Sequence, residues 1–71
     1  MKNETFIKEL REKREQYGVS QTRFAVACGI SREYYNRIEK GKHPLNDELK
    51  EVMAVQIERF NPQEPLFLLI D

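Results

Sequence analysis

The sequence contains too few cysteine and histidine residues for the devices that often stabilise small domains. Its one cysteine, Cys28, excludes an internal disulfide. A structural zinc site needs three or four ligands, which Cys28 and the one histidine, His43, cannot supply. We therefore expect neither a metal nor another cofactor in this chain.

Long hydrophobic runs are also missing. No apolar run is longer than five residues, as at 66–70, whereas a membrane-spanning helix needs roughly 20. Residues 1–10 mix charged and isolated apolar side chains, so they lack the apolar centre of a signal peptide. The sequence therefore predicts a cytoplasmic protein without a membrane partner.

What remains is the composition of a small globular domain with an uneven charge distribution. The chain has 71 residues, 39% of them hydrophobic and 34% charged, which suits one domain at most. Its net charge is zero, but residues 1–43 carry a balance of +4 and residues 44–71 one of −4. A polyanion should therefore meet the first part of the chain.

Hydrophobic spacing and capping residues predict four helices. Their expected ranges are residues 4–17, 21 to 28 or 29, 32–40 and 47–59. Ser20, Ser31 and Asn46 are candidate N-caps, and Gly29 and Gly41 are candidate C-terminal stops. The two short helices are joined by a short turn that contains glycine, so they must cross steeply as a helix-turn-helix unit.

The inward faces of these helices follow from the same spacing. The side chains expected to face the core are Phe6, Ile7, Leu10, Tyr17, Phe24, Ala25, Cys28, Tyr35, Ile38, Leu49, Val52, Met53, Ile57 and Phe60, and the same spacing places Glu39 beside Tyr35 and Ile38. Tyr35 is expected to keep its hydroxyl at the wet edge of this core. Arg14 lies on the apolar stripe of the first helix, and a buried arginine needs a carboxylate partner.

The opposite face of the helix over residues 32–40 is the candidate DNA-reading surface. It presents Arg32, Glu33, Asn36, Arg37 and Lys40. Arginine and asparagine side chains match guanine and adenine edges in the major groove, and we expect Arg32 and Arg37 to contact bases. The alternative is a solvated face in which Glu33 and Arg37 pair at the i, i+4 spacing.

Other polar residues near these helices are candidates for contacts with the DNA backbone. Gln21 opens its helix and is placed to hold a phosphate, although plain capping polarity is the alternative. Tyr34 is a candidate for contact with the sugar-phosphate backbone. Positive charge that would add salt-dependent affinity comes from Arg23, Lys40, Lys42 and His43.

Catalysis is not predicted. A nucleophile needs a neighbouring base and an orienting group, and one histidine with one cysteine cannot form such a set. Cys28 is expected to be a small core residue. We expect a protein that is not an enzyme and has no small-molecule substrate.

A stretch of the sequence resembles the Cro/repressor-type (XRE) helix-turn-helix family. The resemblance is carried by LREKREQYGVSQTRFAVACGISREYYNRIEKGK, with its SQ and SR openings, the turn glycine and the IEKG ending. It implies an all-α bundle of four to five helices with a lambda-repressor-like helix-turn-helix that binds double-stranded DNA. Tyr35, where the family usually has Val or Ile, and an early Pro44 depart from the pattern, so the preferred DNA sequence does not follow by analogy.

The same resemblance implies roles for individual residues. It pairs Arg14 with Glu39 and assigns phosphate binding to Gln21. The groove-facing positions that it implies are Ser31, Arg32, Glu33, Asn36 and Arg37.

A narrower similarity concerns SREYYNRIEKG together with ERFNPQEPLFLLID. These segments look like the amino-terminal helix-turn-helix of relaxase-like replication initiation factors from integrative conjugative elements. Five apolar residues near a carboxyl end support the hypothesis that the chain is the first module of a longer protein. Residues 1–61 would then be the DNA-binding domain, and residues 62–71 a fifth helix, a homodimer seam or the start of another domain.

Two classes of function are therefore expected. The first is sequence-specific binding of double-stranded DNA, either by a transcriptional regulator or by the targeting module of a mobile-element replication protein. The second is a protein-interaction module on the same fold, because a fold does not by itself determine function.

Overall fold

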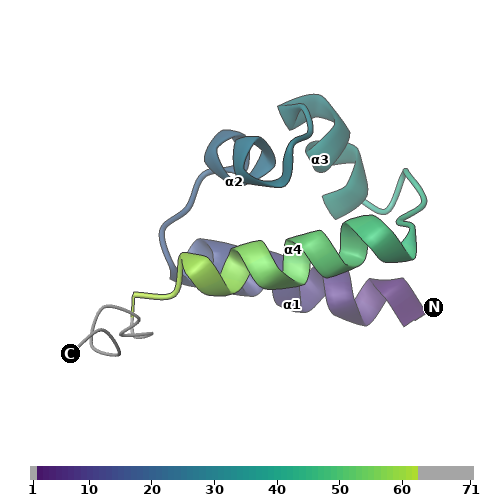
Figure 1. Cartoon of the computed structure of the whole chain (residues 1–71). Helices are drawn as coiled ribbons and strands as arrows, with labels where there is room; N and C mark the ends of the chain where they lie inside the picture. The colour runs from purple at the N-terminus through teal and green to yellow at the C-terminus, as the bar shows by residue number, and fades with distance from the viewer. Residues whose placement is uncertain (1, 63–71) are drawn as a thin grey trace.

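The computed structural model describes residues 2–62, which form four helices (Figure 1). These are α1 (Lys2–Gln16), α2 (Gln21–Cys28), α3 (Arg32–Glu39) and α4 (Asp47–Arg59). Helices α1 and α4 lie side by side and run in the same direction, while α2 packs on α3 and α4, and α3 also packs on α1. The predicted all-α fold is confirmed.

Some of the predictions concern residues outside this description. The fifth helix, dimer seam or next domain expected over residues 62–71 lies outside the described residues, apart from Pro62. Of the four helices described, none is both long and apolar enough to cross a membrane.

The N-terminal ends of α2, α3 and α4 are capped as the sequence predicts. The hydroxyl of Ser20 accepts a hydrogen bond from the Arg23 backbone N–H (3.1 Å), and the hydroxyl of Ser31 accepts one from Tyr34 N–H (3.0 Å). The Asn46 side-chain oxygen accepts from Leu49 N–H (2.7 Å). Each cap satisfies a backbone donor that the helix itself leaves unpaired, so the polar sequence positions define where the helices begin.

The turn between α2 and α3 depends on Gly29. Its backbone is left-handed (φ 77°, ψ 26°), a conformation that a Cβ atom disfavours. The next N–H, of Ile30, donates back to the Ala25 carbonyl (3.0 Å), which closes the end of α2. Only Gly29, Ile30 and Ser31 separate the two helices, and this short connection makes α2 and α3 a helix-turn-helix unit.

The observed helix bounds differ slightly from the predicted ones. Helix α1 begins at Lys2, earlier than predicted, because no breaker precedes residue 4 and the Asn3 side chain donates to the Leu45 carbonyl (3.2 Å). It ends at Gln16, one residue early. Helix α3 ends at Glu39, with Lys40 as its C-cap. Helix α4 has the predicted bounds.

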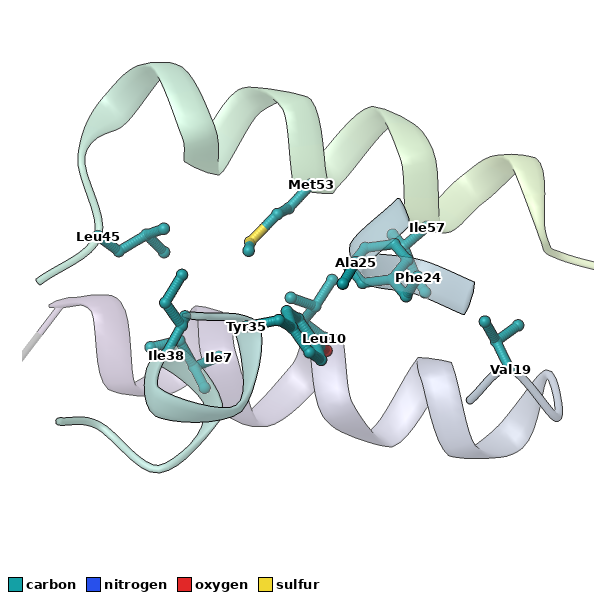
Figure 2. Packing of buried hydrophobic residues seen from close by; sticks show 10 residues of the cluster. All are labelled: Ile7, Leu10, Val19, Phe24, Ala25, Tyr35, Ile38, Leu45, Met53 and Ile57. Atoms are coloured by element: carbon teal, nitrogen blue, oxygen red, sulfur yellow. The ribbon is translucent and has the colours of Figure 1, made fainter. Parts of the chain in front are cut away.

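The core contains buried side chains from all four helices, and Figure 2 shows them in the space between α4 and α1. Its fully buried large side chains are Phe24, Tyr35, Ile38 and Met53. The rings of Phe24 and Tyr35 meet edge to face, with centroids 5.3 Å apart, a favourable arrangement for aromatic quadrupoles. This contact joins α2 directly to α3, so the core holds the helix-turn-helix in one arrangement.

One predicted core position is wrong, and two buried residues were not predicted. Val52 is 40% exposed, contrary to the prediction, because α4 turns its buried stripe through Met53 and Ile57, one step further around the helix. Val19 and Leu45 are buried although they lie in connecting segments, where helical periodicity gives no signal. Cys28 is half-buried, and burial raises the pKa of its thiol to about 11.

Candidate nucleic-acid interface

Glu39 is the centre of a buried polar cluster below the outer face of α3. Arg14 Nε donates to Glu39 Oε2 (2.8 Å), and Arg14 Nη1 donates to the Val19 carbonyl (2.7 Å). Arg14 and Glu39 are each only 8% exposed, so this ion pair is largely removed from water. Burial makes each charge dependent on the other, as the sequence position of Arg14 suggested.

Two further donors complete the coordination of the Glu39 carboxylate. The Tyr35 hydroxyl donates to Oε2, and Gln21 Nε2 donates to Oε1 (2.9 Å). Tyr35 is fully buried, so the expected wet position of its hydroxyl is wrong: the hydroxyl is paired inside the protein. Glu39 thereby connects α1, α2 and α3 through one carboxylate.

The donors also determine the ionisation of Glu39. Burial alone would raise the pKa of this carboxyl, but hydrogen bonds from Arg14, Tyr35 and Gln21 outweigh that effect and lower the pKa below its usual value of 4.5. Glu39 is therefore ionised at neutral pH and accepts hydrogen bonds without donating any.

The cluster continues outward from Gln21 to Asn36. Asn36 Nδ2 donates to Gln21 Oε1 (3.2 Å), and both side chains are half-buried. The sequence placed Gln21 and Asn36 on the interface separately but gave no indication of this contact, because the residues lie on different helices. The Tyr35–Glu39 contact, in contrast, could have been found from their i, i+4 spacing.

The remaining predicted positions on α3 form an exposed face. Ser31, Arg32, Glu33, Arg37 and Lys40 are exposed, as is Lys42 beyond the helix. Within residues 2–62, Glu33 and Arg37 form no ion pair, so the predicted pair is not formed; that these side chains are exposed fits a solvated face as well as a DNA-reading one. A shallow hollow is lined by Asn36, Arg37, Lys40 and Lys42, which bring three positive charges around one amide.

Tyr34 and Arg23 lie beside this face and contact other side chains. Tyr34 is half-buried and meets the His43 ring edge to face, with centroids 4.5 Å apart. The Arg23 guanidinium lies 5.3 Å from the centre of the Phe60 ring, within the range of a cation–π contact. Tyr34 and Arg23, both candidates for contact with the DNA backbone, are therefore also in contact with other side chains of the protein.

Comparison with known proteins gives one family. Neither the curated proteins nor the solved structures contain a significant match to the chain. A family model described as helix-turn-helix matches residues 10–55, well over half of the chain. The matched range contains α2, α3, the Arg14–Glu39 pair and the exposed face of α3. The chain therefore belongs to the Cro/repressor-type (XRE) helix-turn-helix family of DNA-binding domains.

Proposed function

We propose that this protein binds double-stranded DNA sequence-specifically, with α3 in the major groove, and acts as a transcriptional regulator. The observation that carries the proposal is the exposed face of α3: Arg32 is exposed on it, and Arg37, Lys40 and Lys42 line a hollow together with Asn36. A helix with arginine and asparagine on its outer face is the usual reading element of helix-turn-helix proteins.

The proposed contacts divide by chemistry. Arg32 and Arg37 have exposed guanidinium groups that can reach guanine edges. Glu33 can accept a hydrogen bond from a cytosine amino group. The residues proposed to contact phosphate or sugar, and so to set the position of α3, are Gln21, Arg23, Ser31, Tyr34, Lys40 and Lys42.

Selection of duplexes from a random DNA pool, at low and at physiological salt, tests this function. An enriched palindrome with half-sites about one helical turn apart would identify a dimeric regulator. A single short site without symmetry would instead favour the targeting module of a mobile-element replication protein. Absence of enrichment, with binding lost at moderate salt, would contradict sequence-specific binding and favour a protein-interaction module.

Variants then locate the surface on the enriched site. Arg32→Ala and Arg37→Ala should each weaken binding by about 1–3 kcal/mol, because each removes a bidentate base contact. Arg59→Ala is the matched control, since Arg59 is an exposed arginine on α4 outside the proposed surface. Equal affinities of all three variants would refute the assignment of α3.

A further inference from the structure

The hydrogen-bond cluster gives the Gln21 side chain a defined orientation. A carboxylate only accepts hydrogen bonds, so Gln21 must turn its NH₂ group toward Glu39. The amide oxygen of Gln21, Oε1, then points away from Glu39 and accepts a hydrogen bond from Asn36. This orientation follows from the charge of Glu39 and not from a choice between two similar atoms.

The same constraint passes to Asn36. Gln21 Oε1 is an acceptor, so Asn36 must present its NH₂ group inward, as the 3.2 Å contact from Nδ2 shows. No buried side-chain nitrogen or oxygen among residues 2–62 lacks a hydrogen-bond partner. Asn36 Oδ1 has no partner within that range, so it reaches solvent. The outward group of Asn36 is therefore an acceptor, accompanied by the second N–H of Nδ2.

The neighbours of Asn36 make this acceptor distinctive. Arg37, Lys40 and Lys42, which line the hollow together with Asn36, carry only donors on their side chains. Adenine offers an N6 amino donor beside an N7 acceptor, which matches an outward Oδ1 and a free N–H. Guanine offers only the N7 and O6 acceptors, which would face Oδ1 without a hydrogen bond.

We propose that Asn36 determines part of the DNA specificity by selecting adenine over guanine, and that Gln21 is the positioning residue that holds its amide for this choice. This inference rests on the proposed function, because it assigns one base within the site that α3 would read. It gives Gln21 a role in specificity, beyond the phosphate contact proposed above.

The test measures base preference position by position on the enriched duplex, using the full chain. At one position the unaltered protein should prefer adenine over guanine by about tenfold or more. Asn36→Ala should reduce this preference to less than about threefold and leave the other positions unchanged. An unchanged preference at every position in Asn36→Ala would overturn the assignment.

Gln21 variants test the orientation. In Gln21→Met, which keeps the side-chain length, the Asn36 amide is free to rotate, so binding to the guanine-substituted duplex should improve relative to adenine by several-fold. Gln16→Ala, at an exposed glutamine of α1, is the control and should leave the preference unchanged. Retained rejection of guanine in Gln21→Met would show that Gln21 does not orient Asn36.

A measurement on the free protein remains informative if DNA affinity is low. In NMR spectra the Asn36 side-chain amide protons should exchange more slowly with solvent in the unaltered protein than in Gln21→Met, because only the former has the hydrogen bond. Equal exchange rates would overturn the orientation. Failure of the unaltered protein to enrich any sequence would instead refute the proposed function, and this inference with it.

Discussion

Substitution of Glu39 by alanine should destabilise the fold more than alanine substitution of an exposed glutamate. The change removes the partner of Arg14, which is 8% exposed, and leaves the Tyr35 hydroxyl and the Gln21 amide without their acceptor. Arg14 retains its hydrogen bond to the Val19 carbonyl, so its donors are not all lost. The dominant cost is a buried charge whose nearest remaining carboxylate is that of the exposed Glu15, 3.9 Å from Arg14 Nη2.

The expected magnitude is large for a chain of this size. Removal of one partner of a buried ion pair costs about 3–5 kcal/mol, and the remaining Val19 contact favours the lower end. A 71-residue domain has a total stability of roughly 4–11 kcal/mol. A loss of about 3 kcal/mol corresponds to a fall in Tm of about 12–24 °C at this length.

Urea unfolding followed by circular dichroism at pH 7 measures the effect. Glu12→Ala is the control, because Glu12 is an exposed glutamate of α1. Arg14→Ala and the double variant complete a cycle, in which the coupling between the two residues should exceed about 1 kcal/mol. If Glu39→Ala and Glu12→Ala unfold at the same urea concentration, the cluster does not stabilise the fold as argued.

Four further predictions follow from single features. The pKa of Glu39 is lowered on folding, so the stability that its charge contributes is present above the ordinary value of 4.5 and is lost as the pH falls through the folded pKa. The difference in unfolding free energy between the unaltered protein and Glu39→Gln should therefore shrink in acid. A constant difference down to pH 3 would contradict this. Gly29→Ala should cost about 1–2 kcal/mol in urea unfolding from backbone strain alone, since an added Cβ meets no atom within 4 Å; an unchanged midpoint would argue against a left-handed turn. Lys13→Ala breaks the exposed 2.8 Å pair with Glu58 and should cost less than about 1 kcal/mol, so a larger loss would indicate an unrecognised role. With a pKa of about 11, Cys28 in the folded protein should react with iodoacetamide at pH 8 far more slowly than in the urea-unfolded chain, because only about one folded thiol in a thousand is ionised. Equal rates in the two states would contradict the burial of Cys28.

The helices and their order could be predicted because their signals are local. Ser20, Ser31 and Asn46 cap within three residues of themselves, and Gly29 ends α2 by its own backbone conformation. The same is true of Ile38 and Met53, whose burial follows from helical spacing. Local rules therefore gave the four helices and most of the core.

Contacts between separate elements could not be predicted in the same way. The Gln21–Asn36 hydrogen bond and the burial of Val19 and Leu45 depend on how helices and connections meet after folding. Val52 was misassigned because a one-residue step changes the side of α4 by about 100°. The position of Arg14 on the apolar stripe predicts a carboxylate partner without identifying it. Only the family resemblance identified that partner as Glu39.

The cluster around Glu39 also makes the positions on the outer face of α3 differ in how easily their residues can be exchanged. Arg32, Glu33 and Arg37 are exposed and make no side-chain hydrogen bond within the described part of the chain, so exchanging them should cost the fold little. Asn36 is different, because its amide is joined through Gln21 to the buried charge. On the proposed function, exchanges at these three positions would change base contacts one at a time, whereas an exchange at Asn36 would also remove the hydrogen bond to Gln21 Oε1 and so affect two residues together.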